Sequence, residues 1–260
     1  MMRSVGSASD ASASSSVTMS MTDHLRELRM RIVRALIAVA IGMVVVLSFY
    51  DPILRFLTEP YRDLCATNPD FSCDGSLFAL GPLDGFAARI RIATWGGVIL
   101  AMPVVFWQIW RFVAPGLDRR EKKYAVPFIA SITVLFAVGC WMAYWTLDKA
   151  LEFLISWSGS SVDQAYQVSK YVSLVTLMAL AFGAGFLSPV LILFLQLVGV
   201  VTPRSLIRQW RIAIMCIFVA AAVITPSGDP VSLFALSIPM TALYFLAVLI
   251  GWLMTRRRSR

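Results

Sequence analysis

The chain has 260 residues, of which 58% are hydrophobic and 15% are charged, and its formal net charge is +8. Soluble domains carry about 25% charged residues, so this composition excludes an ordinary soluble protein and favours one embedded in a membrane. The chain has a single histidine, His24, and the spacing of its cysteines does not resemble that of a zinc site. No metal or other cofactor is therefore expected.

Residues 1–21 are rich in serine and alanine and lack an apolar core. This composition predicts a disordered tail. It is not typical of a secretory signal peptide, because no short apolar segment precedes a small-residue cleavage site.

A lone acidic residue, Glu27, follows the tail and is surrounded by Arg26, Arg29 and Arg31. The pattern of apolar residues predicts a helix that starts near Met21 and continues into the first apolar stretch. Glu27 and Arg31 are spaced i, i+4, which is typical of an ordinary ion pair on a helix. A carboxylate presented to a cationic ligand is the alternative, and the spacing leaves both open.

Six apolar stretches then follow, and most have the length of about 17–25 residues that a membrane-spanning helix needs. They cover residues 33–50, 92–113, 124–147, 170–198, 211–225 and 230–253. Backbone polar groups cannot go unpaired in lipid, so the spans should be helices. The sequence therefore predicts an all-α polytopic membrane protein with six transmembrane helices, forming one domain over residues 22–254.

The segments between these stretches carry two further signals. Cys65 and Cys73 share the long segment 51–91, where an oxidising compartment would let them form a disulfide. Asp118 and Glu121 precede the third stretch, beside Arg120. Helix capping explains these two carboxylates without a ligand, and a second anionic contact for a cationic ligand is the alternative.

The fifth stretch is short, and the last is interrupted by Pro239. A short span is accommodated by a thinner bilayer or by a partner helix that covers it. Small residues allow another helix to approach closely. We therefore expect a docking surface for a single-span partner, formed by Ala220, Ala221, Ala222, Ile214 and Phe218.

Basic residues gather in four segments that fall on one side of a six-span arrangement. These segments precede residue 33, lie within 114–123 and 204–211, and form the basic tail 255–260. The positive-inside rule then places both termini in the cytoplasm. The basic residues are divided among short loops, which disfavours nucleic-acid binding.

The apolar stretches carry no acidic residue, lysine or histidine near their centres, so no proton or ion relay is indicated. The sequence favours a binding scaffold over an enzyme. A six-span transporter or channel for a small solute is the alternative, but its pore would need more polar side chains than Ser173, Thr176, Gln108 and Gln196. A purely structural membrane anchor would not need paired carboxylates in basic loops.

The chain closely resembles the TatC family, the receptor core of the twin-arginine translocase, in an ordered set of motifs. These are His24-Leu25-x-Glu27-Leu28-Arg29-x-Arg31, Pro60, Pro103 with Gln108, Trp110 and Phe112, Ala114-Pro115, Leu117, Glu121, Tyr171, Phe182-Gly183, Phe186, Pro189, Thr225-Pro226, Asp229 and Ile238-Pro239-Met240.

The resemblance implies a cupped hand of six helices without catalytic residues, located in the bacterial inner membrane. It implies that the cytoplasmic face binds the twin-arginine signal peptides of folded cargo, and that export is driven by the proton-motive force. The contacting residues would be Glu27 and Glu121, with Leu25, Arg29, Phe112 and Arg120 nearby. TatA and TatB-type single-span proteins, other copies of the chain and membrane lipid would be its partners.

Two positions depart from the family pattern. Leu187 stands in the fourth span where the family often carries a glutamate, and Leu233 stands where it often carries a glutamine. Both changes concern the arrangement of partners more than recognition of a signal peptide.

Overall fold

The computed structural model describes residues 21–67, 75–113, 125–158, 166–197, 199–226 and 228–258, and these are almost entirely helical. The helices are α1 (Met21–Ser48), α2 (Tyr50–Thr67), α3 (Asp84–Val113), α5 (Ala125–Ser158), α6 (Val168–Gly185), α7 (Ser188–Leu197), α8 (Pro203–Arg208), α9 (Trp210–Ile224) and α10 (Pro230–Arg258). Five spans within the described ranges are long and apolar enough to cross a membrane, and α9 is a shorter apolar helix.

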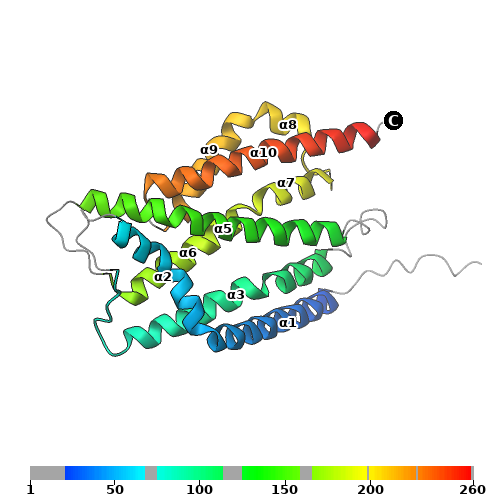
Figure 1. The fold of residues 1–260 in the computed structure, drawn as a ribbon. Coiled ribbons are helices and arrows are strands. Elements are labelled where there is room, and N and C mark those ends of the chain that lie inside the picture. The colour runs from blue at the N-terminus through cyan, green and yellow to red at the C-terminus, as the bar shows by residue number, and fades with distance from the viewer. Residues whose placement is uncertain are drawn as a thin grey trace, which may run out of the picture.

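The helices form an elongated bundle (Figure 1). α1 and α3 lie side by side at one edge, α5 and α6 occupy the middle, and α8, α9 and α10 form the other edge. α1 begins and α10 ends at the same end of the bundle, which we call the termini end. α2 lies at the opposite end, which we call the α2 end.

Glycines bring two pairs of helices into backbone contact. A Cβ on Gly97 of α3 would lie 2.6 Å from the backbone nitrogen of Met43 in α1, and a Cβ on Gly42 would lie 2.7 Å from the carbonyl oxygen of Gly97. A Cβ on Gly139 of α5 would likewise lie 2.6 Å from the carbonyl oxygen of Phe182 in α6. Small residues at helix crossings allow such close approach in membrane proteins.

The main hydrophobic core lies where α5 and α6 meet α2 and α10. Its fully buried side chains include Tyr61, Leu147, Phe182 and Leu236. A smaller cluster joins Val46 of α1, Ala88 and Ile92 of α3, and Val172 of α6. Because both clusters include α6, this helix connects the two edges of the bundle.

The α2 end is more ordered than the sequence indicated. Residues 51–91 were expected to connect two spans, and they contain nearly all of α2 and the first turns of α3. Tyrosine hydroxyls fix α2 to the bundle: Tyr171 donates to the carbonyl of Leu57 at 2.8 Å, and Tyr144 donates to the carbonyl of Phe56 at 3.1 Å. α2 was not predicted because it is amphipathic but too polar to look like a span.

The fourth predicted span, 170–198, is two helices and not one. α6 ends at Gly185, residues 186–187 form a turn, and α7 starts at Ser188. Pro189 explains the break, because it has no N–H to donate to the carbonyl of Gly185. Leu187 lies within this turn and is half-buried.

Other span limits also differ from the expected ones. α5 continues to Ser158, eleven residues beyond the expected end at 147. α10 runs without interruption through Pro239 and includes residues 255–258 of the expected tail. A proline is tolerated within a membrane helix when neighbouring helices and local adjustments satisfy the freed backbone group.

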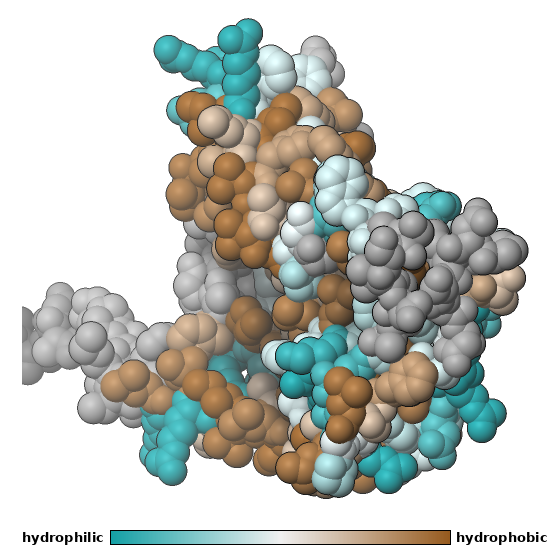
Figure 2. Space-filling view, turned by 90° about the vertical axis from the view of Figure 1, so that its left-hand side faces the viewer, coloured by the Kyte–Doolittle hydropathy of each residue, from teal (hydrophilic) through white to brown (hydrophobic). Residues whose placement is uncertain are grey.

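Figure 2 views the molecule from the α2 end. Hydrophobic residues, coloured brown, cover much of the upper part, and hydrophilic residues, coloured teal, gather lower down and toward the right. The surface is hollowed between the upper and lower parts on the left-hand side. Large exposed hydrophobic side chains are numerous, as expected of a surface that faces lipid.

Candidate functional site

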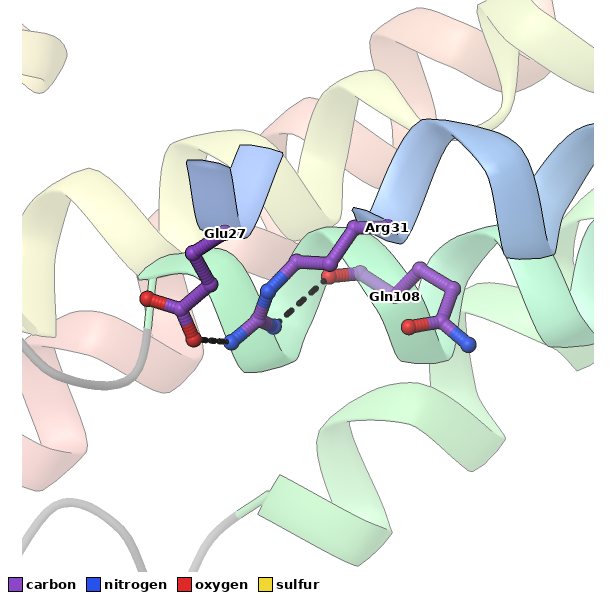
Figure 3. A network of polar contacts seen from close by, with 3 residues as sticks. All are labelled: Glu27, Arg31 and Gln108. Carbon is purple, nitrogen blue, oxygen red and sulfur yellow. Dashed lines mark hydrogen bonds and ion pairs between the residues drawn. The ribbon is translucent and has the colours of Figure 1, made fainter. Parts of the chain in front are cut away.

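The predicted ligand carboxylate, Glu27, lies in the second turn of α1 at the termini end (Figure 3). Arg31, one turn further along, forms an ion pair with it. The same guanidinium donates a second hydrogen bond, of 3.3 Å, to the backbone carbonyl of Gln108 in α3. The spacing i, i+4 places the two side chains on one side of α1, as Figure 3 shows.

Burial is unequal within this pair. The side chain of Arg31 is 10% exposed, whereas that of Glu27 is 30% exposed. Arg31 is therefore a structural cation wedged between α1 and α3, and Glu27 is the member of the pair that a ligand can reach. A buried ion pair compensates for lost hydration only when further hydrogen bonds satisfy its donors, and the Gln108 carbonyl supplies one here.

The side chain of Gln108 extends away from the ion pair, as Figure 3 shows. Its Oε1 atom is buried and has no hydrogen-bond partner in the described part of the chain. Buried polar atoms are nearly always satisfied, so an unpaired one requires an explanation. Because the atom is buried, a ligand could reach it only if the surrounding side chains moved.

Aromatic residues hold the helix ends around this region. The Trp110 ring of α3 lies 4.7 Å from Phe128 of α5 and 6.3 Å from Phe194 of α7, measured between centroids. Phe128 and Phe194 are 5.7 Å apart. This cluster joins three helices at the termini end, and the half-buried Phe112 follows it in the last turn of α3.

The structure brings together only some of the predicted ligand-binding residues. Glu121 and Arg120 lie outside the described residues. Leu25 is 61% exposed, and Arg29 is also exposed. At about 100° per residue, Arg29 lies nearly opposite Glu27 around α1. Arg31 and Gln108 complete the network instead.

The contact of Glu27 with Arg31 was predictable from the sequence, whereas the contribution of Gln108 was not. The ordinary ion pair that the i, i+4 spacing indicated for Glu27 and Arg31 is confirmed. Gln108 was noted only as part of a motif and as a polar side chain within a span, and no local signal could have placed its carbonyl beside Arg31, 77 residues away.

The expected partner surface on α9 requires a correction at Ala221. This residue is 0% exposed and belongs to the main core, so it cannot contact a partner helix. Ala222 is exposed, while Ala220, Ile214 and Phe218 are half-buried. The outward side of α9 was missed, and consists of Ile212, Met215, Val219 and Val223, with exposures from 58% to 80%.

Cys65 lies near the end of α2 and is disulfide-bonded. Its expected partner, Cys73, falls outside the described residues, so that pairing stays a prediction. Cys140 and Cys216 are free. Within the described ranges, no group of three or more His, Cys, Asp or Glu side chains could hold a metal ion.

Comparison with known proteins identifies close relatives. The family model "Sec-independent protein translocase protein (TatC)" matches residues 23–239. The TatC protein of Frankia casuarinae is 41% identical over 249 residues, which span 93% of this chain and 68% of that protein. The TatC protein of Xylanimonas cellulosilytica is 36% identical, over 93% of this chain and 87% of its own.

A solved structure matches as well. The crystal structure of the twin-arginine translocase receptor TatC superposes with a TM-score of 0.73 at 31% sequence identity. The match covers 89% of this chain and 99% of that one. The agreement therefore extends over most of the chain.

Proposed function

The chain belongs to the TatC family of Sec-independent protein translocases, a family of multi-pass membrane transport proteins, and on that premise we propose that it is the receptor subunit of a twin-arginine translocase. In this role it binds the twin-arginine signal peptides of folded proteins, which are exported at the expense of the proton-motive force. The membership disfavours a small-solute transporter or channel.

The observation that carries this proposal is the partly exposed carboxylate of Glu27, which Arg31 holds in place through an ion pair. An arginine guanidinium pairs with a carboxylate through two parallel hydrogen bonds, and a lysine cannot reproduce that geometry. A guanidinium group of the signal peptide therefore suits the carboxylate of Glu27.

Glu121 is the second proposed contact, together with Arg120, Leu25, Arg29 and Phe112. Phe112 lies in the last turn of α3, which ends at Val113, just before the segment that carries Glu121. The chain leaves α3 near Glu27, because α1 and α3 are joined there through Arg31. This placement supports a shared site for the two carboxylates.

We further propose six membrane crossings with both termini in the cytoplasm of a bacterial cell, in the inner membrane. α1 begins and α10 ends at the same end of the bundle, which requires an even number of crossings. The five long spans become six when α9 is counted. Single-span TatA and TatB-type proteins and further copies of the chain are the proposed partners.

Binding of a synthetic twin-arginine peptide to the purified chain tests this function. Glu27→Gln keeps the size of the side chain and removes its charge, and we expect binding to weaken about 10- to 100-fold, from the roughly 1.5–3 kcal/mol of a charged hydrogen bond. Glu152→Gln is the matched control, because Glu152 also pairs with a cation, Lys149, but is exposed elsewhere on α5.

A peptide with two lysines should bind more weakly than the twin-arginine peptide to the parent chain. Photo-crosslinkers at positions 27 and 121 should both capture the twin-arginine peptide. Equal binding by the Glu27→Gln variant and the parent would contradict the assignment.

A further inference from the structure

The side of α1 that faces away from α3 carries a second feature at the termini end. Arg26, Arg29, Met30, Val33 and Arg34 line an open concavity with a volume of about 300 Å³. All five residues are exposed. Three guanidinium groups and two apolar side chains therefore share one hollow.

The geometry of α1 separates this hollow from the Glu27 network. At about 100° per residue, Arg26, Met30 and Val33 lie on one side of the helix. Gly42 and Val46, which pack against α3, lie on the opposite side, as does the buried Arg31. A ligand in the hollow would therefore lie outside the bundle, against the lipid-facing surface of α1.

The arginines of the hollow concentrate positive charge on this side of α1. Glu27 is the only acidic residue between positions 25 and 48, and Arg31 pairs with it. Arg26, Arg29 and Arg34 form no ion pair in the described part of the chain. The hollow is therefore complementary to an anion.

Apolar side chains continue from the hollow along the same side of α1. Below Met30 and Val33, this stripe consists of Ile37, Ile41 and Val44, which are between 54% and 64% exposed. It extends from the arginines into the length of α1 that is apolar enough to span a membrane. The arginines would bind the anionic headgroup of a phospholipid, and the apolar stripe would contact its acyl chains.

We propose that this hollow is a binding site for an anionic phospholipid. The arginines hold the phosphate through charge-assisted, bidentate hydrogen bonds, and an acyl chain lies along Val33, Ile37 and Ile41. Basic pockets beside membrane helices recognise lipid headgroups in this way. The inference rests on the membrane placement in the proposed function, but not on signal-peptide binding.

Native mass spectrometry of the purified full chain tests the site, with phosphatidylglycerol as the anionic lipid and phosphatidylcholine as the neutral one. The variant is Arg26→Gln with Arg34→Gln, and we expect about 30-fold weaker phosphatidylglycerol binding. The matched control is Arg204→Gln with Arg208→Gln, which removes two exposed arginines from α8. The control should bind like the parent chain.

An excess of inorganic phosphate distinguishes a lipid from a free anion. The lipid should stay bound, because the apolar stripe contributes to its affinity. Displacement by phosphate, equal loss in the variant and the control, or equal binding of the two lipids by the parent would each overturn the proposal.

Peptide binding by the Arg26→Gln, Arg34→Gln variant is measured on the same samples and should be unchanged. Equal binding of the two lipids by the parent chain, with intact peptide binding, refutes this inference alone. Failure of the parent chain to bind the twin-arginine peptide, with lipid selectivity intact, refutes the proposed function alone.

Discussion

Arg31 connects the candidate site to the fold. Its guanidinium bonds to Glu27 within α1 and to the carbonyl of Gln108 in α3, so one side chain both orients the carboxylate and joins two helices. A lysine has a single ammonium group and cannot present the same planar fork to both acceptors.

We therefore expect Arg31→Lys to destabilise the protein by about 1.5–3 kcal/mol, the value of a hydrogen bond to a charged group. Thermal unfolding of the purified protein in detergent measures the change. Arg29→Lys is the matched control, since Arg29 is exposed on the other side of the same helix. An equal shift in both variants would show that Arg31 has no special role.

The predicted disulfide between Cys65 and Cys73 is tested by alkylation. Cys65 is disulfide-bonded, so we expect it to react with a thiol reagent only after reduction. Exposed Cys216, which is free, is the internal control and should react without a reductant. Mass spectrometry of peptides identifies the partner, and a partner other than Cys73 would contradict the prediction.

Local sequence patterns predicted part of the site at this scale. The Glu27–Arg31 pair was predictable because both residues lie within one turn of one helix. The separation of Arg29 from Glu27 also follows from helical geometry, but the resemblance to a family motif grouped them together. The contact with Gln108 depends on how α1 packs against α3, which no local pattern specifies.

At the scale of helices, close backbone crossings determine which pairs pack most tightly. α1 crosses α3 at Gly42 and Gly97, and α5 crosses α6 at Gly139 and Gly183. Interiors are packed so densely that one added methyl group forces a shift when its nearest neighbour is backbone.

Gly97→Ala is therefore expected to destabilise the bundle by about 1–3 kcal/mol, because its Cβ would overlap the backbone of α1. Gly85→Ala is the matched control, since nothing lies within 4 Å of a Cβ at that position of α3. Chemical or thermal unfolding in detergent measures both. Similar stability of the two variants would contradict the close backbone crossing of α1 and α3 at Gly97.

The existence of the long apolar helices was predictable from the sequence, but the details of two were not. Pro189 and Pro239 both lie within apolar stretches, yet the first ends a helix and the second does not. Proline removes one backbone hydrogen bond in either case, and packing of the neighbouring helices decides whether the chain continues. That packing involves residues far apart in the sequence.

For the whole molecule, the short helix α9 forms an outer wall of the bundle. Its 15 residues extend about 22 Å, less than the roughly 30 Å of a bilayer's apolar core. One side packs on α10 through Ala221, and the other presents Ile212, Met215, Val219 and Val223. We propose this exposed side as the docking surface for a single-span partner.

Cysteine crosslinking in membranes tests this arrangement. Single cysteines at positions 215, 219 and 223, in a background that lacks Cys216, should crosslink to a cysteine-bearing partner helix. A cysteine at position 221 is the matched control, and it should not crosslink because Ala221 is buried. Crosslinks confined to α1 and α3 would place the partner elsewhere.

The glycine crossings also determine how the bundle responds to force. Two helix pairs, α1 with α3 and α5 with α6, meet backbone to backbone and have little room to slide. α9 contains no glycine and is held by side chains, which can change rotamer. The two glycine crossings therefore make the rest of the bundle more rigid than α9. A partner that exerts force on the molecule would displace α9 before it separated α1 from α3.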